Sequence, residues 1–148
     1  MKKFLLTLIV AVFAINASAQ DYNWAVGVRG GGMASGLTVK HILGGGNAWD
    51  LSVSSYYDGG LYGSMVYEWV NDLGSNFSFF YGAGGHIGAG DKDDSGSFAL
   101  GVDGIVGVEY QIPVAPIAFS LDYRPALNII SNSYFAGYDF GFGVKYTF

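Results

Sequence analysis

The chain has 148 residues, enough for a single domain, and its formal net charge is −5. Hydrophobic residues make up 51% of the chain and charged residues 13%, about half of the charge that a typical soluble domain carries. This balance excludes a disordered or fibrous chain, the lack of a basic patch excludes a nucleic-acid partner, and the absence of cysteine excludes disulfides and metal–thiolate sites.

The first 19 residues have the pattern of a secretory signal peptide. Lys2 and Lys3 precede an apolar run over 4–15, and residues 17–19, Ala-Ser-Ala, fit a small-x-small cleavage site. The apolar run is shorter than the roughly 20 residues that a membrane-spanning helix needs, although an uncleaved anchor is the alternative. We therefore predict a signal peptide over 1–19 and one exported domain over 20–148.

Beyond residue 20, large apolar residues alternate with small or polar ones, and this period of two recurs eight times. In chain order the alternating segments cover 22–30, 35–43, 48–57, 61–70, 77–89, 98–112, 117–124 and 137–148. The first sets Trp24, Val26 and Val28 against Gly27 and Arg29. In the last, GYDFGFGVKYTF, every second residue is large and apolar or aromatic. Each segment is therefore predicted to be a β-strand.

Short clusters rich in glycine, asparagine, aspartate or proline separate the segments. They cover 30–32, 44–47, 58–60, 71–74, 91–96, 113–116 and 128–133. Glycine, asparagine and aspartate permit the positive φ angles that tight hairpins need. The sequence thus predicts consecutive antiparallel hairpins.

A period of two leaves open which face of the sheet is inside. The polar face is mainly glycine, serine, alanine and threonine with scattered charges of both signs, a poor solvent surface but a good tight interior. The apolar face carries aromatic residues towards segment ends: Trp24, Trp49, Trp69, Tyr110, Tyr123 and Tyr146. Such rings favour a bilayer interface, the segments are long enough for the about 9–11 residues of a tilted crossing, and only a closed barrel pairs every backbone group in lipid.

We therefore predict an all-β fold: an eight-stranded antiparallel up-and-down transmembrane barrel. The alternative is a secreted soluble β-barrel whose apolar face encloses an apolar ligand. The charges predicted to face the barrel interior are Arg29, Lys40, Asp50, Glu68, His86, Asp103, Glu109, Asp122, Arg124, Asp139 and Lys145. Isolated burial of a charge costs several kcal/mol, so we expect pairs such as Lys40 with Asp50 and Arg124 with Asp139.

An eight-stranded barrel is just wide enough for side chains to fill it, so porin-like conduction is not expected, although a narrow gated path is an alternative. Of the two histidines, His41 is expected near a turn or the lipid edge. No spacing brings His86 together with a serine and a carboxylate for catalysis, so we predict no enzyme activity, no cofactor and no metal site. The acidic tract over 91–94 is expected to be a solvated loop tip rather than a weak calcium site.

The chain resembles the small eight-stranded outer-membrane proteins of Gram-negative bacteria, the OmpA/OmpX type. The signal peptide, the eight alternating segments and the aromatic last segment carry this resemblance, and the stretches GLTVKHIL and FYGAGGHIGAG also resemble those of outer-membrane barrels without known activity. The resemblance implies a monomer in the outer-membrane lipid with a structural or surface-interaction role in the cell envelope. It also implies that Phe142, Val144, Tyr146 and Phe148 form the signal read by the barrel assembly machinery.

Overall fold

The computed structural model describes residues 23–32, 34–43, 46–56, 60–90, 97–130 and 135–148. The signal peptide expected over 1–19 and the acidic tract over 91–94 lie outside the described residues, so both stay predictions. Within the described ranges, no helix is long and apolar enough to cross a membrane.

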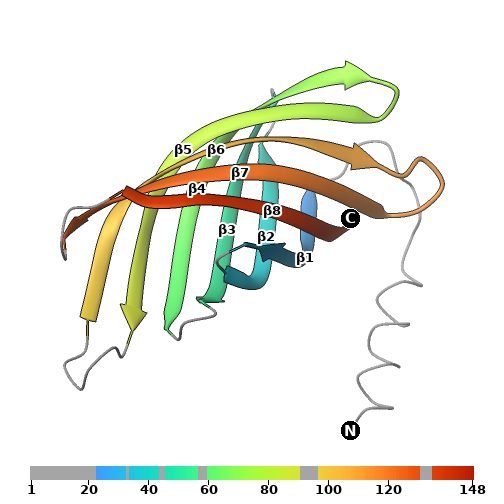
Figure 1. The fold of residues 1–148 in the computed structure, drawn as a ribbon. Helices are drawn as coiled ribbons and strands as arrows, with labels where there is room; N and C mark the ends of the chain where they lie inside the picture. The colour runs from blue at the N-terminus through green and yellow to red at the C-terminus, as the bar shows by residue number, and fades with distance from the viewer. Residues whose placement is uncertain (1–22, 33, 44–45, 57–59, 91–96, 131–134) are drawn as a thin grey trace, which may run out of the picture.

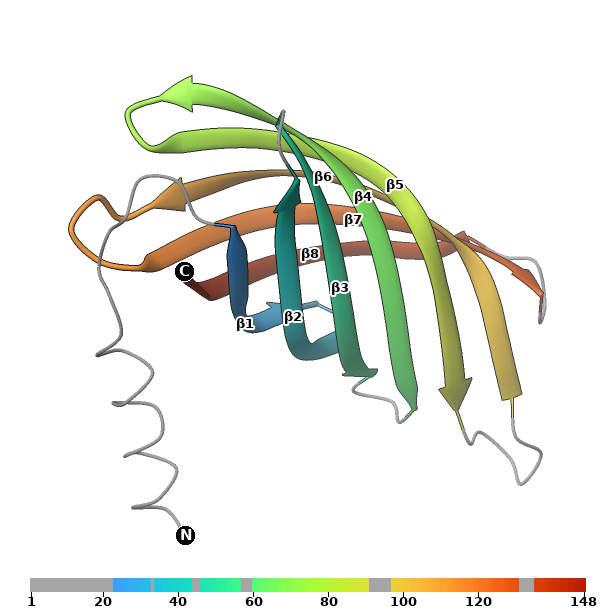
Figure 2. The same cartoon turned by 180° about the vertical axis from the view of Figure 1, so that it is seen from behind.

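Eight antiparallel strands form one closed barrel (Figures 1 and 2). They are β1 (Trp24–Gly31), β2 (Ala34–Leu43), β3 (Asn47–Tyr56), β4 (Leu61–Gly74), β5 (Phe77–Gly90), β6 (Ser97–Gln111), β7 (Ile117–Ile130) and β8 (Phe135–Thr147). Each strand pairs with the next in sequence, and β1 pairs with β8, which closes the sheet and removes its edges. The predicted fold class, an eight-stranded up-and-down antiparallel barrel, is confirmed.

The β4–β5 hairpin reverses later than the sequence predicts. A turn is expected over 71–74, but β4 continues through Gly74 and the chain reverses at Ser75 and Asn76. These two residues have positive φ angles of 54° and 67°, the geometry of hairpin turns whose twist matches the flanking strands. The backbone N–H of Gly74 donates to Asp72 Oδ1 at 2.8 Å, so the polar residues expected in the turn close the end of the strand instead.

Strand β7 also extends beyond its predicted end. The alternation stops at Pro125, yet the strand runs on to Ile130. Proline cannot donate a backbone hydrogen bond, and strands admit it at irregular positions. The β7–β8 register indeed shifts between Pro125 and Leu127. This extension places Asn128, expected in a turn, within the strand and buries it.

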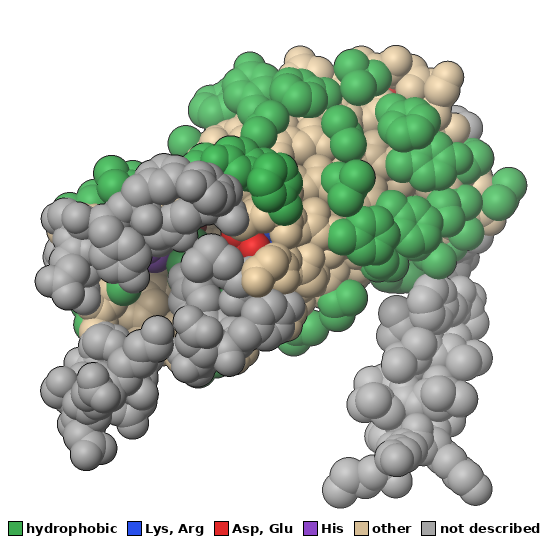
Figure 3. Space-filling view, viewed as in Figure 1, with side chains coloured by type: hydrophobic (Ala, Val, Ile, Leu, Met, Phe, Trp, Pro, Cys, Tyr) green, Lys and Arg blue, Asp and Glu red, His purple; other side chains and the backbone are tan. Residues whose placement is uncertain are grey.

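The polarity of the barrel is the reverse of that of a soluble sheet protein. The outward face carries exposed large apolar side chains, among them Leu37, Leu51 and Leu121, each at least 50% exposed. Figure 3 shows apolar side chains spread over the face of the wall that is in view, with charged side chains scarcely visible there. The buried apolar cluster of the interior is small: Val66, Phe80 and Ile105, with Val70 packed against them. The remaining interior is polar, as expected for a barrel whose outer wall meets lipid.

Aromatic side chains gather at the end of the barrel that carries Trp24 and Phe148, which we call the inner end; the opposite end is the outer end. Ring contacts run along the wall from Trp49 to Tyr67 at 4.9 Å, from Tyr67 to Trp69 at 5.1 Å, and from Trp69 to Tyr81 at 5.7 Å. His41, expected near a turn or the lipid edge, lies outward here and stacks on Trp24 at 4.1 Å. Amphipathic rings of this kind stabilise a wall at a membrane interface.

Candidate functional site

The candidate site is the polar interior, because every predicted interior charge points there. Ten of the eleven side chains belong to residues at most 8% exposed: Arg29, Lys40, Asp50, Glu68, His86, Asp103, Glu109, Asp122, Arg124 and Lys145. The eleventh, Asp139, is 17% exposed through its side chain. The strands place all of them by simple alternation, because every second side chain points to the same face.

The interior near the inner end holds the lysine cluster: Lys40, Asp50, Glu68, Glu109 and Lys145. Lys40 Nζ lies 2.9 Å from a Glu68 oxygen and 3.5 Å from a Glu109 oxygen. Lys145 Nζ lies 3.7 Å from the same Glu109 oxygen and 3.5 Å from Asp50. These five side chains come from β2, β3, β4, β6 and β8, so the cluster spans the lumen rather than following one hairpin.

Arg124 crosses the lumen from β7 to the opposite wall. Its guanidinium donates to Asp50 at 3.2 Å and to Ser52 and Ser64 at 3.2 Å each. Thr38 donates to the same Asp50 carboxylate at 3.1 Å. Asp50 therefore receives donors from several strands, which satisfies a fully buried carboxylate.

Two arginines share one carboxylate and thereby extend the network towards the outer end. Arg29 Nη2 lies 2.5 Å from Asp122 Oδ1, and its Nε donates to both Asp122 oxygens at 3.0 Å. Arg29 Nη1 also lies 2.6 Å from Asp139. Arg124 Nε lies 3.6 Å from Asp122 on its other side. One connected chain of opposite charges therefore runs from the lysine cluster to Asp139.

The ion pairs of Lys40 and Arg124 reach beyond the neighbouring strands of the sheet. Lys40 and Asp50 are register neighbours, as are Arg124 and Asp139. The Lys40 ammonium instead lies 2.9 Å from Glu68, and Arg124 extends to Asp50 on β3. The physical reason is length, because long lysine and arginine side chains reach across a narrow lumen to strands that are not adjacent.

Glycine makes room for these long side chains. A Cβ atom at Gly141 would lie 2.3 Å from the guanidinium carbon of Arg29, and one at Gly101 would lie 2.5 Å from Cε1 of His86. Real Cβ atoms do not approach other atoms so closely, so each large side chain lies flat on a position without a side chain. Inward glycines such as Gly141 and Gly101 thus leave the space that the long inward side chains occupy.

A second group of interior side chains, which we call the histidine cluster, lies nearer the outer end. It consists of Tyr62, His86, Asp103 and Asn128. His86 Nδ1 lies 2.5 Å from Asp103, and His86 Nε2 lies 2.6 Å from the amide oxygen of Asn128. The Tyr62 hydroxyl donates to the other Asp103 oxygen at 2.7 Å. The hydrogen bonds of Tyr62 and Asn128 were not predicted from the sequence. The alternation along β4 does place the side chain of Tyr62 on the inward face.

Both ring nitrogens of His86 face Asp103 and Asn128, which leaves neither nitrogen to activate a hydroxyl nucleophile. Across the part of the chain that the structure describes, no three histidine, cysteine, aspartate or glutamate side chains are grouped to hold a metal ion.

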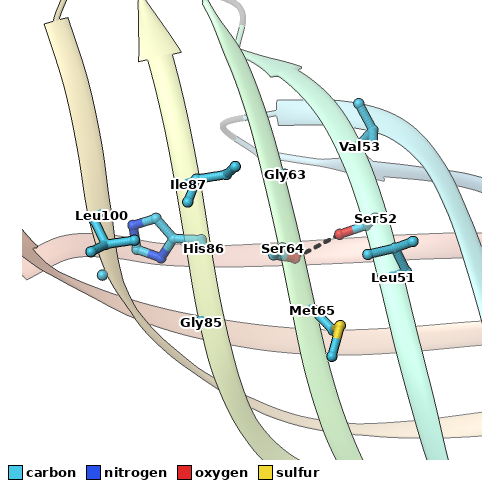
Figure 4. Close-up of a pocket in the computed structure, with 11 residues that line it drawn as sticks. Leu51, Ser52, Val53, Gly63, Ser64, Met65, Gly85, His86, Ile87 and Leu100 are labelled. Atoms are coloured by element: carbon cyan, nitrogen blue, oxygen red, sulfur yellow. Dashed lines mark hydrogen bonds between the residues drawn. The ribbon is translucent and has the colours of Figure 1, made fainter.

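A hollow of about 340 Å³ opens on the outside of the wall (Figure 4). Gly63 and Gly85 are among its lining residues, and the outward-facing side chains around it are Leu51, Val53, Met65, Ile87 and Leu100. The hollow is a gap in the apolar wall where two outward positions lack side chains. Its lining also includes Ser52, Ser64 and His86, whose side chains make hydrogen bonds in the interior.

The last strand places the expected assembly signal on the outward face. Phe142 and Phe148 are 48% and 56% exposed, and Val144 and Tyr146 are half-buried on the same face. Their recognition by the assembly machinery stays a prediction.

Comparison with known proteins supports the fold. The chain is similar to the crystal structure of the N-terminal β-barrel domain of Pseudomonas aeruginosa OprF, with 15% identity, a TM-score of 0.70, and coverage of 87% of this chain and 100% of that chain. It is also similar to Neisserial surface protein A, with 15% identity, a TM-score of 0.59, and coverage of 84% and 93%. No protein-family model matches the sequence, and no curated protein matches it. The resemblance to small eight-stranded outer-membrane barrels is thus confirmed at the level of the fold.

Proposed function

We propose that this chain, whose fold is that of the small eight-stranded outer-membrane barrels, is an integral protein of the bacterial outer membrane. Its role is structural or surface-interacting within the cell envelope, and it is neither an enzyme nor an open pore. The observation that carries the proposal is the reversed polarity of the wall: exposed leucines, valines and aromatic rings outside, and paired buried charges inside.

Lipid is the partner that fits the outer wall. In water, the exposed apolar side chains would lose the roughly 25 cal/mol per Å² that burial contributes. In a bilayer the same side chains meet hydrocarbon, while the closed ladder from β1 through β8 satisfies the backbone without water. The aromatic contacts from Trp49 to Tyr81 mark the inner interface. A soluble barrel around an apolar ligand fits poorly, because the interior is charged.

The contents of the lumen favour a structural role over conduction. Phe80, Val66 and Ile105 pack inside the wall, and Lys40 Nζ lies 4.6 Å above the Phe80 ring. The lysine cluster and Arg124 occupy the space beside them with side chains tied to several strands. An ion crossing this region would have to displace several buried ion pairs, each costly to break.

The remaining partner is the machinery that inserts barrels. Phe142, Val144, Tyr146 and Phe148 present an apolar stripe on the outside of the last strand, and we expect this stripe to be read during insertion. We expect a monomer, because the closed ladder leaves no strand edge for a second copy to pair with.

Two measurements on the full chain test the proposal. The outer-membrane fraction is first run on a gel with and without boiling; a closed membrane barrel resists detergent until heated, so the band is expected to shift. The refolded protein is then added to a planar bilayer, where no steady conductance is expected. A soluble protein without a shift would overturn the membrane assignment, whereas a shift together with steady conductance would replace the structural role with a narrow channel.

A further inference from the structure

We propose that the hollow on the outside of the wall binds one acyl chain of a membrane lipid and holds it against the barrel. This site rests on the proposed function, since only a barrel in a bilayer meets lipid chains, and it adds the place on the wall and the part of the lipid involved. Three features carry it: the shape of the hollow, its depth in the wall, and the direction of the polar side chains beside it.

Two glycines on neighbouring strands create the hollow. In one row of paired outward residues, Gly63 lies between Val53 and Ile87. In the next outward row, Gly85 is paired with Met65. Because the two rows are adjacent, the two positions without side chains join into one depression of about 340 Å³ (Figure 4).

The packing of the barrel itself does not require glycine at position 63. A Cβ atom there would lie 3.8 Å from Cγ1 of Ile87, which is an ordinary van der Waals contact. The inward Gly84 differs, since a Cβ there would overlap the backbone oxygen of Met65. Glycine weakens the interior of a strand and often marks a place where a ligand approaches closely. The space over Gly63 is therefore open to a molecule outside the chain.

The hollow lies within the part of the wall that is expected to face hydrocarbon. On β3, Leu51 and Val53 follow Trp49, a member of the aromatic contacts, by two and four residues. Strands rise about 3.4 Å per residue and tilt by about 35–45° in membrane barrels, so the hollow lies roughly 5–10 Å from the aromatic level. Towards the outer end, the exposed Leu61 and Phe98 continue the apolar wall. Since the apolar band of such barrels is about 25 Å tall, the hollow lies inside it.

The polar side chains that border the hollow are directed into the barrel. Ser52 and Ser64 hydrogen-bond to each other at 2.7 Å, and His86 contacts Asp103 and Asn128. The side chains that project from the wall around the hollow are those of leucine, valine, isoleucine and methionine. This lining suits an acyl chain, which needs no hydrogen bonds, rather than a polar headgroup.

An acyl chain fits the hollow by size and by packing. An apolar cavity of about 150 Å³ stays dry and binds benzene, so the larger hollow has room for a run of methylene groups. Lipid chains are as apolar as leucine, so the hydrophobic effect does not favour the hollow over the bilayer. Dispersion does, because an unfilled hollow forfeits contact to the atoms that line it. A chain in the hollow touches Leu51, Met65 and Ile87 and should leave more slowly than chains on the surrounding wall.

The first test counts the lipid that the barrel retains. The refolded full chain is placed in phosphatidylcholine vesicles, extracted with a mild detergent and analysed by native mass spectrometry. One phospholipid per chain is expected on the unsubstituted protein. Gly63→Leu fills the hollow with a side chain, and the retained phospholipid is expected to be lost. Gly30→Leu is the matched control, the same change at an exposed glycine of β1 with nothing within 4 Å of its Cβ, and it is expected to keep the phospholipid.

Equal retention in Gly63→Leu and the unsubstituted protein, or no retained phospholipid on either, would overturn the acyl-chain site. A two-chain species that disappears in Gly63→Leu would also overturn it and make a second copy the occupant. The heat-dependent band shift, measured on each variant, separates this outcome from failure of the proposed function. A protein that shifts but fails the lipid test loses only the acyl-chain site, whereas a protein that does not shift loses the membrane barrel as well.

A second measurement needs no variant, and it decides if Gly63→Leu does not fold. The methyl group of Met65, which borders the hollow, is labelled with ¹³C and observed by NMR in phosphatidylcholine nanodiscs. Phosphatidylcholine with a nitroxide in the middle of its acyl chain is expected to broaden the Met65 signal, and phosphatidylcholine with a nitroxide on its headgroup is expected to leave it sharp. Broadening by the headgroup label alone, or by neither label, would overturn the proposal.

Discussion

Asp122 offers the sharpest test of the interior network, because it is the one carboxylate placed between Arg29 and Arg124 among the described contacts. Replacing it by asparagine keeps the shape and removes the charge. Three Arg29 nitrogen–oxygen contacts of 2.5 to 3.0 Å lose their ionic partner, and Arg124 loses a carboxylate at 3.6 Å. Removing one partner of a buried ion pair costs about 3–5 kcal/mol. Asparagine keeps one acceptor oxygen, so we expect a loss of about 3 kcal/mol in the free energy of unfolding.

The assay is urea unfolding of the refolded barrel in detergent micelles, followed by tryptophan fluorescence. Asp139→Asn is the matched control; its side chain is 17% exposed, and we expect a loss nearer about 1 kcal/mol. The double variant Arg29→Met with Asp122→Leu should be more stable than Arg29→Met or Asp122→Leu alone, because each single variant leaves the other member of this pair buried without its closest partner. A D122N loss within about 0.5 kcal/mol, the size of an ordinary surface change, would refute a structural role for this charge.

Three further variants test other parts of the wall. Gly141→Ala should cost about 1–3 kcal/mol in urea unfolding, because its Cβ would push the Arg29 guanidinium away from Asp122 and Asp139. Gly30→Ala, with nothing within 4 Å, should be neutral, and equal effects would contradict the packing argument. Leu51→Arg on the outer wall should cost about 2–4 kcal/mol when the barrel is folded in lipid vesicles, and no cost there would argue against contact with hydrocarbon. Phe80→Ala should cost about 3–5 kcal/mol and leave the heat-dependent band shift intact, so loss of the shift would give Phe80 a role in closing the barrel.

Alternation in the sequence predicts most of the fold because it is a local property. The period of two assigns each residue to a face, and short turns between alternating segments make each strand pair with the next. The faces of Arg29, Lys40 and Glu68 follow from this rule alone. Strand ends follow less well, since Asn71, Asp72 and Asn128 have turn-forming side chains but lie in strands, where each is paired with a residue of the neighbouring strand.

Partners across the lumen cannot be predicted in the same way. Local pairing suggests Lys40 with Asp50, whereas the contacts join Lys40 to Glu68 and Arg124 to Asp50. These contacts depend on the width of the lumen and on where glycine leaves space, which no single segment encodes. The role of Asn128 is hidden for the same reason, because its partner His86 lies 42 residues away and two strands across.

The closure of the ladder between β1 and β8 has a kinetic consequence. Most strand pairs form between neighbours in sequence, but this seam joins the two ends of the domain. The ion pairs inside depend on it, because Arg29 and Asp122 are 93 residues apart, and Lys145 and Asp50 are 95 apart. Contacts between residues so far apart in the sequence form slowly, because the chain loses the conformational entropy of a long loop before the contact can stabilise it. Until the seam closes, the lumen charges lack their partners, so completion of the barrel and neutralisation of its interior should be a single late step in folding.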